Sequence, residues 1–141
     1  MDAAPDPTAL AVGQEIPNVE RETGFANWNR YAAVNDEFVP IHMDDDAGRE
    51  AGYASAFGMG NLQWSYLHTV LRRWLGDDGQ IIRVACQFRG PNLKGQTVTA
   101  RGRITALRPA GARLEVDLDV WTENQDGEAM APGTATVSLP V

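Results

Sequence analysis

The residues best suited to chemistry lie between Tyr31 and His42, in the stretch YAAVNDEFVPIH. His42 is one of only two histidines, and an imidazole is the side chain best able to move protons near neutral pH. Glu37 lies five residues earlier. Residues five apart point to different faces of a helix and to opposite faces of a strand, so these two side chains can meet only if the chain bends. Pro40 favours a bend, because it stops a helix and drives Val39 toward extended geometry. An acid and an imidazole facing each other across this turn would form a general acid/base pair. The alternative is an ordinary polar loop in which His42 caps a neighbouring element.

Short helices are predicted on both sides of this turn. Apolar residues at helical spacing in 25–33 predict a helix that leads into it. After His42, the run Asp44, Asp45 and Asp46 is typical of a helix start, where one carboxylate caps the backbone and the others favour the positive end of the dipole. Consecutive acids lack the alternating ligand spacing of a calcium loop, so we expect no metal site.

The strongest helix signal covers Asn61–Leu75. Its apolar positions recur every three or four residues, at Met59, Leu62, Tyr66, Leu67, Val70, Leu71, Trp74 and Leu75. Gly76 to Gly79 ends the helix, and His68 within it is expected to be a packed or surface residue. The glycines just before the helix could serve chemistry, because free backbone N–H groups at a helix start can receive a developing negative charge.

The rest of the chain alternates between apolar and polar residues with a period of two, which predicts strands. The apolar positions are Ile82, Val84, Cys86 and Phe88; Val98, Ala100, Gly102 and Ile104; Leu114, Val116, Leu118 and Val120; and Ala135, Val137 and Leu139. Glycine-rich turns separate them, and 12–22 is expected to add an edge strand. One long amphipathic helix followed by antiparallel strands predicts an α+β domain whose curved sheet wraps around the helix.

Length and composition indicate one globular domain. The 141 residues can bury a core without disulfides, and the single Cys86 is expected to be a buried structural thiol. Residues 1–11, with two prolines, are expected to form a flexible leader before a domain at 12–141. A formal net charge of −7 argues against general nucleic-acid binding. No signal-peptide pattern or membrane-spanning apolar run is present, so a cytoplasmic location without membrane contact is expected.

From about Val12 to Leu139, the sequence resembles the MaoC-like (R)-specific enoyl-CoA hydratases and (3R)-hydroxyacyl dehydratases. The signature of that family is Y-A-x-x-S-G-D-x-N-P-x-H followed by an aspartate, then H-G-M before the central helix. Without a gap, Tyr31, Pro40, His42 and Asp44 match the first part, and Gly58-Met59 matches the second. The turns at 88–91 and 124–127 are also similar to the family. The resemblance implies a single hot-dog domain.

Several positions depart from the family pattern. Glu37 stands at the position of the catalytic aspartate, Asp36 at that of the glycine, Val39 at that of the asparagine, and Phe57 at that of the second histidine. We interpret Glu37 as the working carboxylate because the ungapped match places it five residues before His42. Asp36 takes this role instead if the turn is formed differently.

The resemblance implies reversible addition of water to a trans-2-enoyl thioester, giving the (3R)-hydroxyacyl product. Glu37 and His42 would hold one water and share its protons, and the Gly58 N–H with the central-helix dipole would meet the thioester oxygen. Substrate-binding positions implied by the family are Tyr31, Phe57, Met59 and Asn61. No metal or redox cofactor is expected, because coenzyme A or acyl carrier protein only carries the acyl group.

The same resemblance implies a homodimer, or a heterodimer with a related hot-dog subunit. Two other functions stay open: a non-catalytic or co-catalytic subunit of a hetero-oligomeric dehydratase, and a hot-dog thioesterase. Retention of both Glu37 and His42 argues against a purely structural subunit.

Overall fold

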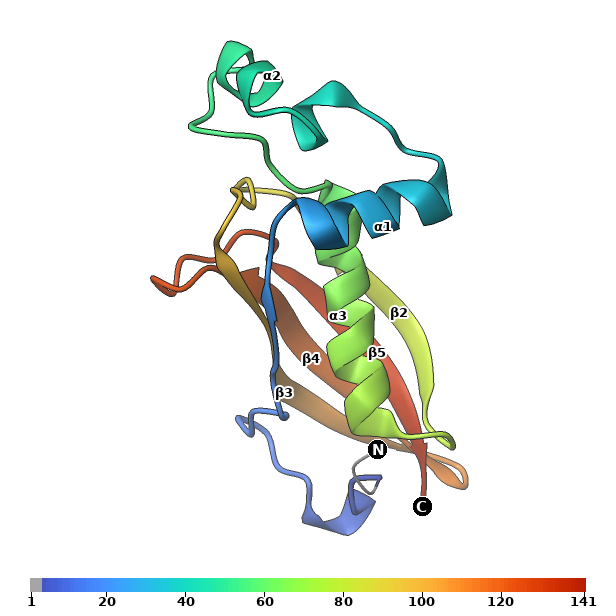
Figure 1. Cartoon of the computed structure of the whole chain (residues 1–141). Coiled ribbons are helices and arrows are strands. Elements are labelled where there is room, and N and C mark those ends of the chain that lie inside the picture. Colours follow the sequence, from blue (N-terminus) through green and yellow to red (C-terminus); the bar gives the residue numbers. More distant parts are fainter. Residues whose placement is uncertain (1–3) are drawn as a thin grey trace.

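A strongly curved antiparallel sheet wraps around one long helix, α3, in the computed structural model, which describes residues 4–141 (Figure 1). The elements in chain order are η1 (Pro7–Ala9), β1 (Val19–Glu22), α1 (Phe25–Asn35), η2 (Pro40–His42), α2 (Asp45–Glu50), α3 (Gly60–Leu75), β2 (Gln80–Cys86), β3 (Thr97–Ala110), β4 (Arg113–Glu123) and β5 (Gly133–Pro140). Residues 1–3 of the predicted leader lie outside the described residues.

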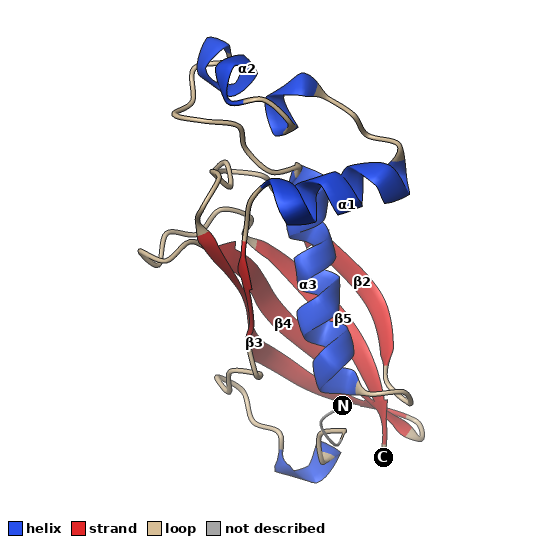
Figure 2. Cartoon of the chain, viewed as in Figure 1, coloured by secondary structure: helices blue, strands red, loops and turns tan. Residues whose placement is uncertain are grey.

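The five strands form one sheet in the order β1-β3-β4-β5-β2, and all neighbouring strands are antiparallel. Consecutive strands β3, β4 and β5 make up a meander, while β1 and β2 form the two edges. Figure 2 shows α3 on one side of this sheet, α1, η2 and α2 beyond one end of it, and η1 beyond the other end. The prediction of an α+β domain with a sheet curled around a long helix is therefore confirmed.

The core lies between α3 and the concave face of the sheet. The helix contributes the apolar stripe predicted from its periodicity, and the sheet contributes the inward-facing residues of β3, β4 and β5, including Val98, Ile104, Val116, Leu118, Val137 and Leu139. Burying each such side chain stabilises the fold by roughly 1.5–3 kcal/mol. The helix ends where predicted, at Gly76, whose φ of 67° is one that glycine adopts without strain.

Residues 23–59 form an overhang at one end of the sheet, which we call the helical cap (Figure 1). Its first helix, α1, is fixed to the core by Trp28 and Ala32, both fully buried. The predicted helix before the turn is confirmed and extends to Asn35. The predicted cap of α2 is also confirmed, since the Asp44 carboxylate accepts hydrogen bonds from the backbone N–H groups of Asp46 (2.7 Å) and Ala47 (3.3 Å).

Strand β2 departs from the predicted alternation. The pairing with β5 shifts register between Ile81 and Arg83, so Ile81 packs toward the core while Ile82 is 54% exposed. The prediction that Ile82 shares the inner face with Val84 and Cys86 is therefore wrong, because one extra residue in a bulge reverses the side-chain parity. Phe88 lies beyond the end of the strand and is exposed.

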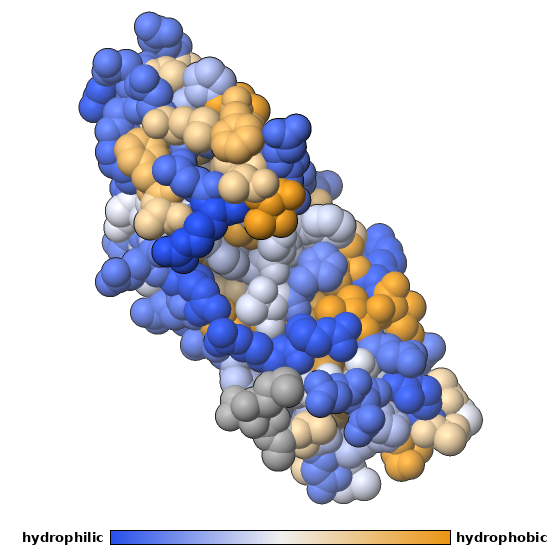
Figure 3. All heavy atoms as spheres, turned by 45° about the vertical axis from the view of Figure 1, so that its right-hand side comes forward, coloured by the Kyte–Doolittle hydropathy of each residue, from blue (hydrophilic) through white to orange (hydrophobic). Residues whose placement is uncertain are grey.

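The predicted first strand is also shorter than expected, because only Val19–Glu22 pairs continuously with β3. Before it, Pro7–Ala9 forms a short 3-10 helix, and Leu10 packs against the core. The division into a leader at 1–11 and a domain at 12–141 stays a prediction. Figure 3 shows apolar residues exposed among polar ones at the capped end and further down the same face. Among residues 4–141, no helix has both the length and the apolar character needed to cross a bilayer.

Candidate functional site

The turn after α1 begins at Asp36, which adopts a left-handed conformation with φ 54° and ψ 41°. It is the only residue other than glycine with positive φ in the described part of the chain. Aspartate tolerates this conformation better than most residues, which explains why it can stand where the related family has glycine. The Glu37 N–H donates to the Ala32 carbonyl (3.0 Å), so the chain folds back over the end of α1.

The second half of the turn is shaped by Pro40. Val39 is extended, with φ −101° and ψ 128°, and Pro40 then starts the 3-10 helix η2. The predicted bend is confirmed, and it places His42 Nε2 4.0 Å from Glu37 Oε1. Glu37 and His42 therefore face each other across the turn, while Asp36 is exposed and has no hydrogen bond from its side chain within residues 4–141.

A backbone atom holds the imidazole of His42. Its Nδ1 lies 2.7 Å from the Phe57 carbonyl oxygen, and the Phe57 ring meets the imidazole edge-on with centroids 5.4 Å apart. Because a carbonyl only accepts hydrogen bonds, Nδ1 carries the proton and Nε2 is left to face Glu37. His42 is 7% exposed, so its ring is fixed by packing as well as by this bond.

The gap between Glu37 and His42 fits one water molecule. At 4.0 Å the two atoms are too far apart for a direct hydrogen bond. An ionised carboxylate and an unprotonated Nε2 are both acceptors, so a water between them can donate one hydrogen to each. This arrangement can orient a water oxygen and accept or return its protons.

The glycine turn before α3 is tightly packed. A Cβ on Gly58 would lie 2.8 Å from Trp28 Nε1 and 3.1 Å from Asn92 Oδ1, so the position has no room for a side chain. Trp28 Nε1 is buried and has no hydrogen-bond partner among the described residues. The Gly58 N–H, predicted to receive the oxyanion, donates to the Asn92 carbonyl at 2.7 Å.

The N–H of Gly60, the first residue of α3, is free by contrast. No hydrogen bond within residues 4–141 uses it as a donor. The first N–H groups of any α-helix lack a partner within the helix, and they form the positive end of its dipole. Gly60 also lines the cavity on this side of the site.

Asn92, which sequence reasoning missed, supports the glycine turn from the sheet side. It is 1% exposed, and its Nδ2 donates to Thr23 Oγ1 at 2.8 Å while its carbonyl receives the Gly58 N–H. The only sequence signal for it is its place directly after the turn at 88–91 that resembles the family.

A second link ties the helical cap to the same loop. The Asp45 carboxylate pairs with Lys94 and accepts the Ala56 N–H at 3.1 Å. The hydrogen bond from Lys94, followed by that from Ala56, lowers the pKa of Asp45 below its ordinary value. This carboxylate therefore connects α2 both to the loop before α3 and to the loop after β2.

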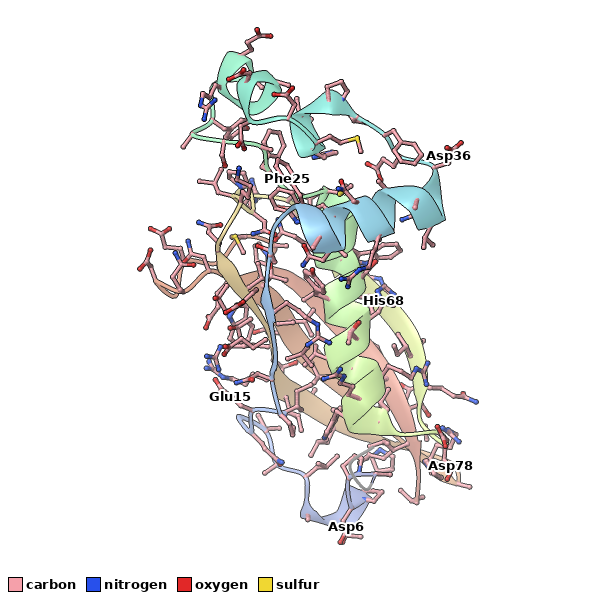
Figure 4. All side chains as sticks on the ribbon, viewed as in Figure 1. Asp6, Glu15, Phe25, Asp36, His68 and Asp78 are labelled. Atoms are coloured by element: carbon pink, nitrogen blue, oxygen red, sulfur yellow. The ribbon has the colours of Figure 1, made fainter. Side chains whose placement is uncertain are left out.

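Two cavities flank the Glu37–His42 pair. The first, which we call the glycine-side cavity, has a volume of about 260 Å³, and its lining includes Tyr53, Phe57, Gly58, Gly60, Phe88 and Arg89. The second, which we call the α1–α3 groove, has a volume of about 560 Å³ and is lined by Tyr31, Asn35, Asp36, Glu37, Asn61, Trp64 and Ser65. Figure 4 shows Asp36 at the end of α1, near the start of α3.

The predicted site residues thus separate into three groups. Tyr31, Glu37 and Asn61 line the α1–α3 groove, and Phe57 and Gly58 line the glycine-side cavity, with His42 contacting one residue of each set. Met59 is 1% exposed, belongs to the core and lines neither cavity. Asn35, Trp64 and Ser65 were missed. The signal for Trp64 and Ser65 was their spacing of three and four residues from Asn61 on α3.

No group of three or more His, Cys, Asp and Glu side chains in residues 4–141 is placed to hold a metal ion. The site comprises Glu37, His42, backbone amides and the two cavities.

Similarity to known proteins covers nearly the whole chain. No family model matches it. The (R)-specific enoyl-CoA hydratase of Aeromonas caviae is 28% identical over 133 residues, which cover 94% of this chain and 97% of that protein. The solved structure of an (R)-hydratase from A. caviae involved in PHA biosynthesis matches with a TM-score of 0.83 at 26% identity, over 94% of this chain and 98% of that one.

More distant structures share the fold. A MaoC-like dehydratase from Rhodospirillum rubrum matches with a TM-score of 0.78 at 20% identity, over 94% of both chains. The ChsH1-ChsH2 complex from Mycobacterium tuberculosis matches with a TM-score of 0.80 at 19% identity, over 92% of this chain and 98% of that one. The second example is a complex of two different subunits.

Proposed function

We propose that this chain, a member of the family of MaoC-like (R)-specific enoyl-CoA hydratases and (3R)-hydroxyacyl dehydratases, reversibly adds water to trans-2-enoyl thioesters through Glu37 and His42. The observation that carries the proposal is the 4.0 Å gap between the Glu37 carboxylate and Nε2 of an imidazole whose other nitrogen is held by a backbone carbonyl. This geometry can hold one water between the two side chains.

The protons balance within this pair. The water oxygen adds to C3 of the enoyl group, and one of its hydrogens stays on the new hydroxyl. The other hydrogen is taken up by the pair and is then delivered to C2. The pair therefore ends each turnover with the protons it started with. Dehydration runs through the same steps in reverse, and the thioester bond stays intact in both directions.

Negative charge gathers on the thioester oxygen as water adds, and a backbone donor is needed there. The family resemblance points to Gly58, but its N–H is engaged with Asn92. We assign this role to the Gly60 N–H, because it is free, lies at the positive end of the α3 dipole and borders the glycine-side cavity. The thioester carbonyl would then enter from that cavity.

The carrier attached to the thioester would extend to the protein surface through the glycine-side cavity. Arg89 lines it and has an exposed guanidinium, which suits the phosphate groups of coenzyme A or of a phosphopantetheine arm. On a chain with a formal net charge of −7, a local cation at the entrance offsets the general repulsion of an anionic carrier.

A spectroscopic assay tests the function. Crotonyl-CoA or a longer trans-2-enoyl-CoA is mixed with the purified chain, and decay of the enoyl-thioester absorbance is followed beside the Glu37→Gln and His42→Ala variants. We expect decay with the wild-type chain, loss of nearly all of it in both variants, and no release of free thiol. Release of thiol would indicate a thioesterase. Activity of His42→Ala at the wild-type level would refute the site.

The quaternary state is the second part of the proposal. β2 is an edge strand with Ile82 exposed, so a second hot-dog subunit can extend the sheet there, either another copy or a related chain. The ChsH1-ChsH2 structure, which shares this fold, is a complex of two different subunits. Light scattering of the purified chain should give twice the monomer mass if it pairs with itself. A stable monomer without hydratase activity would favour a missing partner subunit.

A further inference from the structure

We infer that the α1–α3 groove receives an acyl tail that bears hydroxyl groups, rather than a plain alkyl tail. This inference rests on the proposed function, because the enoyl carbons must lie beside Glu37 and His42. The thioester and its carrier occupy the glycine-side cavity in that arrangement. The part of the acyl group beyond C3 then extends past Glu37, which is itself part of the groove lining.

The side chains of the groove are polar almost throughout. Tyr31, Asn35 and Asn61 supply a phenol and two amides, and no hydrogen bond within residues 4–141 uses the polar atoms of these three side chains. Ser65 donates its hydroxyl to the Asn61 carbonyl, so it can still accept. A groove of about 560 Å³ is within the range of small-molecule sites.

An alkyl tail would fit this lining poorly. It would take water away from the Tyr31 phenol and the Asn61 amide without replacing the lost hydrogen bonds, whereas a hydroxyl can both donate to and accept from them. Sites built to hydrogen-bond a substrate hydroxyl discriminate strongly against the analogue without it. Trp64, 40% exposed, offers a flat apolar surface for the carbon chain between such groups.

The negative charge of the groove argues against acyl tails that carry a carboxylate. Asp36 and Glu37 both line the groove, and no lysine or arginine among residues 4–141 does. A carboxylated tail would be repelled by these acids, so the hydrogen-bonding groups on the tail should be neutral. The structure therefore favours a hydroxylated acyl thioester over both an alkyl and a dicarboxylic one.

The test compares trans-2-octenoyl-CoA with its ω-hydroxy and ω-carboxy derivatives by decay of the enoyl-thioester absorbance. We expect kcat/KM of the wild-type chain to be at least about tenfold higher for the ω-hydroxy substrate than for the alkyl one, and lowest for the ω-carboxy substrate. The Asn61→Leu variant should bring the ratio of ω-hydroxy to alkyl close to one, and Tyr31→Phe should lower it. Asn18→Leu is the matched control, because Asn18 is exposed on the segment before β1 and does not line the groove.

Binding separates this inference from the proposed function. The saturated octanoyl-CoA and ω-hydroxyoctanoyl-CoA cannot be hydrated, so calorimetry measures their affinity whether or not the chain is a hydratase. Tighter binding of the ω-hydroxy compound, lost in Asn61→Leu, supports the groove even if no enoyl substrate reacts. Equal or weaker binding of that compound, or a preference unchanged in Asn61→Leu, overturns the inference even if crotonyl-CoA is hydrated.

Discussion

His42 Nδ1 and the carbonyl oxygen of Phe57 are 2.7 Å apart, and this contact decides which nitrogen of the imidazole faces Glu37. The anchor is a backbone atom, so it does not depend on which side chain occupies position 57. Phenylalanine can therefore stand where the related family has histidine, and its ring adds edge-on packing against His42.

Changes at Glu37 should test the width of the gap. We expect Glu37→Asp to lower kcat by about ten- to a hundredfold, because the shorter arm widens a 4.0 Å gap that one water fills. Asp36→Asn, measured in the same enoyl-thioester assay, should stay within about threefold of wild type on an uncharged alkyl substrate. A larger loss in Asp36→Asn than in Glu37→Asp would move the catalytic role to Asp36.

The proposed oxyanion donor can be removed by substitution. Gly60→Pro deletes the N–H, and proline suits this first helical position because Met59 before it is already extended, with φ −63° and ψ 136°. Gly60→Ala keeps the N–H and adds the same Cβ, which in both variants requires the exposed Phe88 ring to move. We expect kcat of Gly60→Pro to be about 10²–10³ below that of Gly60→Ala. Equal kcat values would exclude this donor.

The role of Arg89 predicts an effect on substrate affinity. Arg89→Gln should raise KM for an enoyl-CoA with little change in kcat, because the carrier phosphates are bound equally in the ground state and the transition state. The difference in KM should shrink as salt is added. Arg83→Gln, an equally exposed change on β2, is the control and should leave KM as it is. A lower kcat at unchanged KM in Arg89→Gln would contradict a carrier role.

The link between Asp45 and Lys94 predicts a pH dependence of stability. The pKa of Asp45 is lowered in the folded chain, first by the Lys94 hydrogen bond, so its contribution is present above its unfolded pKa of about 3.8 and is lost as the pH falls through the folded value. Asp45→Asn should therefore lower Tm at pH 7, and the difference should shrink well below pH 3.8. Asp46→Asn, which loses only an exposed ion pair, should change Tm less at either pH. A Tm difference that grows on acidification would contradict this assignment.

The sequence predicted which segments form helices and strands better than it predicted how the strands pair. Periodicity located α3 and the inner faces of β3, β4 and β5, because one buried face repeats along each element. It failed at Ile82, because a bulge depends on how β2 pairs with β5 and leaves no mark in the alternation itself. The bend between Glu37 and His42 was predictable because Pro40 restricts the backbone locally.

The parts of the site that depend on distant residues were less predictable. Whether the Gly58 N–H is free is decided by the Asn92 carbonyl, which approaches from a loop after β2. Likewise, the α1–α3 groove brings Asn35 beside Asn61 and Trp64 from another helix. Sequence spacing can show which residues share one face of a helix, but it cannot show which residues of another helix lie opposite them.

The helical cap carries most of the proposed site but little of the core. Glu37, His42 and Phe57 all lie in this cap, while most of the core is supplied by α3 and the strands after it. Neither Glu37 nor the η2 turn belongs to the sheet or to its edge strands. A duplicated gene could therefore lose catalysis through a few changes in the cap and still encode a folded subunit able to pair with its active sister.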